Sequence, residues 1–180
     1  MAAWVGAFFA VSALLGVSGA LKAWRPAPAA AALGALGLPS STSLVRIGGA
    51  VEVVVAVGAL LRGDRPFALL VAASYLLFAM FVVAALWRRV PLASCGCFGG
   101  DETPPTLTHV GVDLAAAGFA GLVAVRPTGG MADVAAMGEG PLVGLLFLVL
   151  TGTAAYLAYA ALTLLPRLDA SVRRSARGAA

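Results

Sequence analysis

Long apolar runs alternate with short polar links along the whole chain. Five of the runs are long enough to cross the roughly 30 Å hydrocarbon core of a bilayer, which takes about 20 helical residues. They extend approximately over Ala3–Leu21, Leu44–Leu61, Phe67–Trp87, Leu107–Val125 and Leu142–Leu165. This pattern predicts an all-α, polytopic transmembrane helical bundle with about five spanning helices.

The links between these runs differ in composition. Lys22–Ser43 is rich in Ala, Pro and Gly and is expected to hold a short interfacial helix, whereas Arg62–Pro66 is typical of a tight turn. Arg126–Pro141 contains Gly and Met and is expected to be flexible. We expect residues 1–165 to form one transmembrane domain and the basic residues 166–180 to form a disordered tail.

Composition supports a membrane protein. Hydrophobic residues make up 61% and charged residues 11% of the chain, and the mean hydropathy is +0.98, unlike a soluble domain. No basic groove interleaved with aromatic residues is present, so nucleic-acid binding is not expected. Small residues recur at every fourth position, which lets helices approach closely in lipid, although an alanine-rich chain also produces this spacing by chance. They are Ser12, Gly16 and Ala20, and again Ala117 and Gly121.

Two arguments about sidedness conflict. With five crossings, the first link, the segment after the third run and the tail share one side. That side carries eight basic residues against three on the other: Lys22, Arg25, Arg88, Arg89, Arg167, Arg173, Arg174 and Arg177 against Arg62, Arg65 and Arg126. The positive-inside rule places the eight in the cytoplasm. Stable disulfides belong to oxidising compartments, which would place the same side outside it.

Both cysteines of the chain, Cys95 and Cys97, lie in the segment after the third run and are separated only by Gly96. Thiols this close can be joined only if the backbone turns, and glycine permits the turn. A strained, exposed disulfide is easily reduced, and a disulfide that closes so short a loop adds little stability to the fold. The spacing therefore favours thiol–disulfide exchange over a structural disulfide.

Metal binding and inert thiols are the alternatives for Cys95 and Cys97. A structural zinc ion usually takes four ligands at wider cysteine spacing, whereas here two closely spaced thiols are accompanied by one histidine, His109, and the carboxylates of Asp101 and Asp113. A Cu(I) ion would accept two thiolates, so copper is the more plausible metal. We assign no metal ligand from the sequence and keep copper binding as an alternative.

Five ionisable residues are expected in the half of the bilayer beneath the cysteines: Lys22, Arg46, Glu52, His109 and Asp113. The i, i+4 spacing places the histidine and the second acid on one helix face. Such groups are costly in a membrane and usually face the bundle interior, which predicts a polar pocket. A cation there would favour the thiolate, and a histidine can carry protons. Snorkelling cations and structurally paired acids are the alternative.

The run Cys95-Gly96-Cys97-Phe98-Gly99 after a third apolar helix resembles the MauE family of methylamine-utilisation membrane proteins, relatives of DoxX-like bundles. The resemblance covers about Ala3–Val125. It includes Gly19 and Lys22 at the end of the first run, Leu38-Pro39 in the first link, and Glu52 in the second run. It implies a four-helix DoxX-like core with one further helix.

The family is implicated in maturation of the disulfide-rich small subunit of methylamine dehydrogenase, beside a thioredoxin-like partner. The resemblance thus implies a cell-membrane component that exchanges disulfides outside the cytoplasm with such a partner and with a disulfide-containing client. No cofactor is expected; a quinone acceptor is conceivable by analogy with other disulfide-forming membrane proteins, but no residue specifically supports it. A non-enzymatic assembly or transport factor and a copper-handling protein remain the alternative functions.

Overall fold

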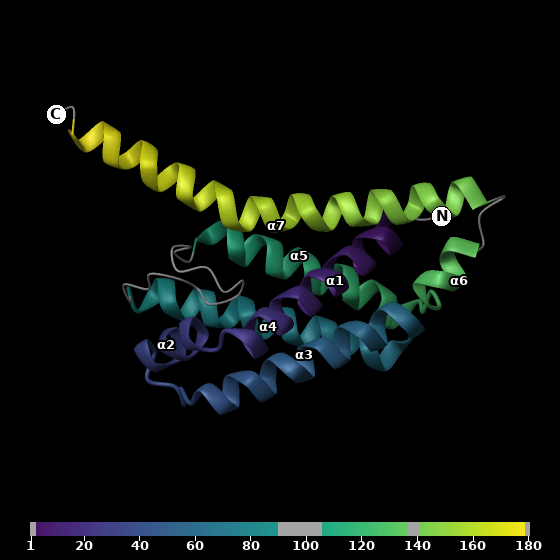
Figure 1. Ribbon diagram of the computed structural model, residues 1–180, viewed down its shortest axis with the longest axis horizontal. Helices are drawn as coiled ribbons and strands as arrows, with labels where there is room; N and C mark the ends of the chain where they lie inside the picture. Colours follow the sequence, from purple (N-terminus) through teal and green to yellow (C-terminus); the bar gives the residue numbers. More distant parts are fainter. Residues whose placement is uncertain (1–2, 90–105, 137–140, 179–180) are drawn as a thin grey trace.

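The structure is a computed structural model that describes residues 3–89, 106–136 and 141–178, with side chains described as far as Ala160 (Figure 1). These residues form helices and no strand, which confirms the all-α prediction. The helices are α1 (Ala3–Trp24), α2 (Ala27–Ala35), α3 (Thr42–Arg62), α4 (Arg65–Trp87), α5 (Leu107–Val125), α6 (Met131–Ala136) and α7 (Pro141–Gly178).

Within the described residues, five helices are long and apolar enough to cross a membrane. These segments are Trp4–Trp24, Thr42–Arg62, Arg65–Trp87, Leu107–Val125 and Leu142–Ala160, and they match the five runs predicted from the sequence to within a few residues. They carry most of the large exposed apolar side chains, as expected for surfaces that face lipid. The chain is a multi-pass membrane protein.

Helix α1 supplies much of the core. Its side chains Phe8, Phe9 and Leu15 are fully buried among residues of α3, α4 and α5. Phe9 also meets Phe147 of α7 edge to face, with ring centroids 6.2 Å apart. A hydrogen bond ties α1 to α4, because the Tyr75 hydroxyl donates to the carbonyl of Val11 over 2.7 Å.

Two glycines let α1 and α3 cross with their backbones almost in contact. A Cβ atom on Gly49 would lie 2.5 Å from the carbonyl oxygen of Gly19, and one on Gly19 would lie 2.6 Å from the carbonyl oxygen of Gly49. Any side chain there would therefore force the helices apart. The predicted small-residue spacing indicates that helices approach closely but does not identify the residues in contact. Ala20 is exposed, and a Cβ on Gly121 would meet no atom within 4 Å.

The segments that link the spanning helices agree only partly with the structure predicted for them. The first contains α2, as expected, and the tight turn is confirmed: Gly63 ends α3 in the left-handed region at φ 53°, and Asp64 caps α4. The link predicted to be flexible contains the short helix α6. The backbone of α7 is helical as far as Gly178, so it continues through most of the segment expected to be a disordered tail. The division into a domain and a tail stays a prediction.

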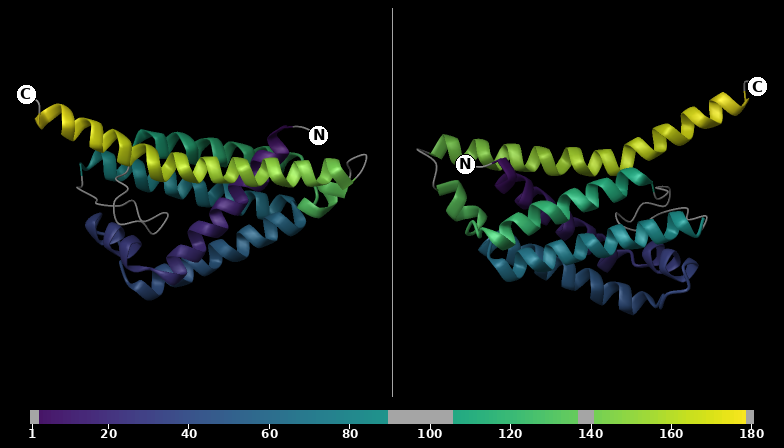
Figure 2. Two further views of the ribbon diagram at one scale, coloured as in Figure 1. Left: turned by 45° about the horizontal axis from the view of Figure 1, so that its top comes forward. Right: turned by 180° about the vertical axis from the view of Figure 1, so that it is seen from behind.

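Helix α2, the C-terminal ends of α1 and α4, and the N-terminal ends of α3 and α5 lie at one end of the bundle, hereafter the α2 end (Figures 1 and 2). The Arg88 guanidinium at the end of α4 donates a hydrogen bond to the carbonyl of Leu36, just after α2, over 3.1 Å. Helix α7 runs along the outside of the bundle, and its C-terminal part extends beyond the other helices (Figure 2).

Candidate functional site

The predicted exchange pair and its loop, namely Cys95, Gly96, Cys97, Phe98 and Gly99, lie outside the described residues. The chain enters this segment from the end of α4 and leaves it at Thr106, which begins α5. Both of these positions are at the α2 end of the bundle (Figure 1). The polar residues that the structure places near this end are therefore the candidates for a site around the thiols.

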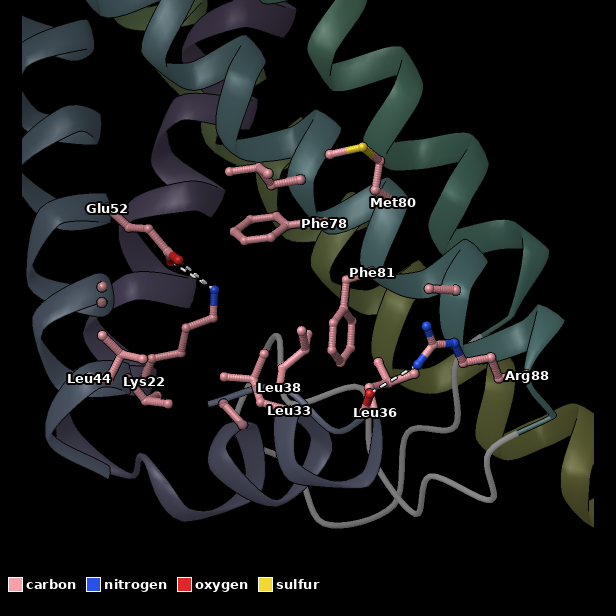
Figure 3. A pocket seen from close by; sticks show the side chains of 16 residues that line it. Lys22, Leu33, Leu36, Leu38, Leu44, Glu52, Phe78, Met80, Phe81 and Arg88 are labelled. Carbon is pink, nitrogen blue, oxygen red and sulfur yellow. Dashed lines mark hydrogen bonds and ion pairs between the residues drawn. The ribbon is translucent and has the colours of Figure 1, made fainter. Parts of the chain in front are cut away.

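Lys22 and Glu52 form the closest polar contact in this part of the bundle. The Lys22 ammonium donates to both carboxylate oxygens of Glu52, over 2.7 and 2.9 Å, and both side chains are largely buried (Figure 3). Nζ of Lys22 also lies 4.0 Å from the centroid of the Phe78 ring, a cation–π contact. Since an ammonium group has three N–H donors, these contacts leave Lys22 little capacity for a further ligand.

The close crossing of α1 and α3 produces this ion pair. Gly19 lies one turn before Lys22 on α1, and Gly49 lies one turn before Glu52 on α3. Because the two helices are antiparallel, each glycine faces the charged residue of the other helix: a Cβ on Gly19 would lie 2.8 Å from Cβ of Glu52, and one on Gly49 would lie 3.0 Å from Cβ of Lys22. The close approach at the two glycines therefore lets the Lys22 and Glu52 side chains meet across the crossing. The sequence predicts that Lys22 or Arg46 neutralises Glu52, and the structure selects Lys22.

Arg46 does not join the pair. Its side chain is exposed on α3, and the described residues provide it with no ion-pair partner. Since an arginine side chain has a long apolar stem, this position suits a guanidinium that reaches towards the headgroups. The snorkelling alternative is therefore the better description of Arg46.

His109 and Asp113 lie on one face of α5, as their spacing predicts, and both are buried. Nδ1 of His109 and the Thr106 hydroxyl are hydrogen-bonded over 2.8 Å. Thr106 is the N-cap residue of α5, and its side chain makes no hydrogen bond to the helix backbone because it is directed to the imidazole. Neither His109 nor Asp113 lines the cavity that contains Lys22 and Glu52, so the five predicted residues do not form one pocket.

Nε2 of His109 is buried, and the described residues offer it no hydrogen-bond partner. Leaving a buried polar atom unpaired costs about 1–3 kcal/mol, and such atoms are rare in folded proteins. The nitrogen is therefore free to bind a water molecule, a ligand or a further polar group. The sequence already places His109 close to the cysteine segment, but only the structure distinguishes its satisfied nitrogen from its unsatisfied one.

A cavity of about 510 Å³ lies between α3 and α4 at the α2 end (Figure 3). Apart from Lys22, Glu52 and Arg88, its lining is apolar: Ala29, Leu33, Leu36, Leu38, Leu44, Val45, Gly48, Gly49, Leu77, Phe78, Met80, Phe81 and Ala84. The sequence does not predict this cavity. Its lining comes from four helices, and no local pattern reveals how far α3 and α4 diverge.

Five apolar spans and buried ionisable groups inside the bundle define this chain as a multi-pass helical membrane protein. The model of the family described as "Methylamine utilisation protein MauE" matches residues 1–126, well over half of the chain. The chain belongs to the MauE family, as the cysteine motif predicts. The match ends with α5, so α6 and α7 lie beyond it. Comparisons with the curated proteins and with the solved structures give no match.

Proposed function

We propose that this protein is a membrane thiol–disulfide exchange component that assists the oxidative maturation of extracytoplasmic proteins, with Cys95 and Cys97 as the exchanging pair. Both cysteines lie within the part of the chain that belongs to the MauE family. One structural observation supports the proposal most directly. The helix that follows the cysteine segment begins with a buried histidine, His109, whose Nε2 lacks a partner among the described residues.

The proposed reaction moves two electrons and two protons. A thiolate of the client attacks the Cys95–Cys97 disulfide, which forms a mixed disulfide and releases one cysteine of this chain as a thiolate. The second client thiolate then displaces the other cysteine, so the client is oxidised and Cys95 and Cys97 are reduced. The disulfide of a thioredoxin-like partner reoxidises them by the same two steps. No cofactor is required, because the partner accepts the electrons.

His109 is proposed to exchange the proton with these thiols. Only the thiolate form of cysteine attacks a disulfide, so each step needs a nearby group that accepts or returns a proton. Nε2 is the polar atom on α5 that is available for this role, and the bond from Thr106 to Nδ1 fixes the ring orientation. Asp113 lies one turn further along the same helix face.

The proposed client by family analogy is the disulfide-rich small subunit of methylamine dehydrogenase. The family description names methylamine utilisation, which supports a role in that metabolism. The reaction also requires the cysteines to face the oxidising side of the membrane. A membrane-impermeant maleimide on intact cells tests this directly. We expect labelling of Cys95 and Cys97 after mild reduction, and labelling only in lysed cells would contradict the proposed side.

Trapping the mixed disulfide tests the function. Cys95 and Cys97 are the only cysteines in the chain, so the Cys95→Ser and Cys97→Ser variants each leave a single thiol. One of the two should accumulate in a covalent adduct with a partner or client, and reductant should release that adduct. The double serine variant is the matched control and should form none. If neither single variant forms an adduct and both still support maturation, the exchange function is wrong.

The double serine variant also separates the two alternative functions. A non-enzymatic assembly or transport factor would retain its function without thiols. A copper-handling protein would instead purify with about one Cu(I) per chain, bound by the two thiolates, and would lose that metal in the double variant.

A further inference from the structure

The cavity between α3 and α4 is open on the face that would meet lipid. Leu44 on α3 and Leu77 and Met80 on α4 line it and are 49%, 59% and 59% exposed. All three lie within spans that are apolar enough to cross a membrane. In a bilayer, this opening therefore faces hydrocarbon rather than water, and the ligand that it suits is an acyl chain.

Two exposed tryptophans indicate the depth of the cavity. Trp24 ends α1 and Trp87 ends α4, and they are 81% and 86% exposed. Tryptophan concentrates at the membrane–water interface, so the α2 end of the bundle lies at the level of the headgroups. Arg88 follows Trp87 directly and lines the cavity. Glu52, ten residues after Thr42, lies about 15 Å further along α3. The cavity thus extends from the headgroup level into the hydrocarbon core.

Among the described residues that line the cavity, the charge at the headgroup level is positive. Glu52 compensates Lys22 deeper in the cavity, so that pair adds no net charge. Arg88 is exposed and uses one N–H group on the carbonyl of Leu36, whereas a guanidinium carries five N–H donors. The described residues give Arg88 no acidic partner. It can therefore bind an anionic oxygen at the mouth of the cavity, such as a phosphate of a lipid headgroup.

We propose that this cavity is a binding site for an anionic phospholipid, with one acyl chain between α3 and α4 and the phosphate at Arg88. The volume of about 510 Å³ lies within the roughly 300–1,000 Å³ that small-molecule sites occupy. Phe78 and Phe81 project into the cavity and would flank the chain (Figure 3). The site is separate from the proposed thiol chemistry and does not depend on it.

Lipid retention by the purified full chain tests this site. The probe is an equal mixture of phosphatidylglycerol and phosphatidylcholine with identical acyl chains, and native mass spectrometry counts the lipids retained in detergent. We expect phosphatidylglycerol to be retained about fivefold over phosphatidylcholine, the difference that one arginine near a headgroup provides. No preference in the unmodified protein would overturn the assignment of the headgroup site.

Two variants distinguish binding of the acyl chain in the cavity from binding of the headgroup at Arg88. Gly48→Leu places a side chain in the cavity, where a Cβ meets no atom within 4 Å, and should abolish retention of both lipids. Arg88→Gln should keep retention but remove the preference for phosphatidylglycerol. Gly118→Leu and Arg46→Gln are the matched controls, because neither residue lines the cavity, and both should behave as the unmodified protein. Unchanged retention in Gly48→Leu would overturn the proposal.

Photolabelling of the unmodified protein gives a second measurement that requires no variant. Phosphatidylglycerol with a diazirine on one acyl chain should label the α3 and α4 segments around Leu44, Leu77 and Met80 more than the lipid-facing side of α7. Uniform labelling of all lipid-facing helices would show that the cavity takes no particular lipid. Crosslinks from this face to a second protein chain would show that a protein covers it, and would likewise overturn the proposal.

Discussion

Two buried polar clusters in the described part of the bundle differ in how completely their groups are paired. Between α1 and α3, Lys22 and Glu52 satisfy one another through two hydrogen bonds, and Phe78 covers the ammonium. On α5, one nitrogen of His109 is bonded to Thr106, but the other has no partner among the described residues. The first cluster is closed, whereas the second retains an available group.

This difference assigns them different roles. A fully paired ion pair in a low-dielectric region is costly to break and does not readily take part in a reaction. We therefore interpret Lys22 and Glu52 as a structural ion pair that holds α1 and α3 together. A buried imidazole with one available nitrogen can bind or transfer a proton. Under the proposed function, proton transfer is therefore assigned to His109 on α5, and the α1–α3 ion pair has a structural role.

Gly49→Val should have the largest effect, because it disrupts the crossing and the ion pair together. The first side-chain atom would lie 2.5 Å from the carbonyl oxygen of Gly19 and 3.0 Å from Cβ of Lys22. Overpacking and a broken buried ion pair together predict a loss of about 5 kcal/mol, enough to remove most of the folded protein. Thermal unfolding in detergent measures this loss.

Gly48→Val is the matched control for that variant. Gly48 is the preceding residue of the same helix, but a Cβ there meets no atom within 4 Å. Its melting temperature should stay close to that of the unmodified protein. Equal destabilisation by the two substitutions would mean that helix propensity rather than the close crossing explains the effect.

Lys22→Met should have the next largest effect. It leaves the carboxylate of Glu52 largely buried without its cation, which costs about 3 kcal/mol of stability. The double variant Lys22→Met/Glu52→Leu removes both charges and should recover to within about 1 kcal/mol of the unmodified protein. Unfolding of both variants in detergent checks this. If the double variant is no more stable than the single one, the pair is not the closed structural unit described above.

The sequence predicts much of this arrangement because the relevant signals are local. Hydropathy locates all five spans, and the i, i+4 spacing places His109 and Asp113 on one face. Which cation pairs with Glu52 depends on the register of α1 against α3. That register is determined by Gly19 and Gly49, two glycines far apart in the chain. A single sequence carries no signal for such a contact, and this also explains why the cavity between α3 and α4 is not predicted.

His109→Leu should affect reactivity much more than stability. The substitution loses the hydrogen bond between Nδ1 and Thr106 but also removes the buried, unpaired Nε2. Because these two effects offset one another, the free energy of unfolding should change by no more than about 1 kcal/mol. If His109 accepts the thiol proton, the alkylation rate of reduced Cys95 and Cys97 should fall about tenfold or more. The Lys22→Met/Glu52→Leu double variant should leave that rate unchanged. The opposite result, with only the double variant slow to react, would reverse the roles assigned to the two clusters.

Arg46→Gln should have the smallest effect, because Arg46 belongs to neither cluster. Its side chain is exposed, and in the described part of the chain no carboxylate pairs with it. We expect the melting temperature and the alkylation rate of the cysteines to match those of the unmodified protein, since exposed charges away from specific contacts contribute little. Both assays above measure this variant directly. A marked loss of stability would mean that Arg46, and not Lys22 alone, compensates Glu52, and the α1–α3 cluster would then be larger than an ion pair.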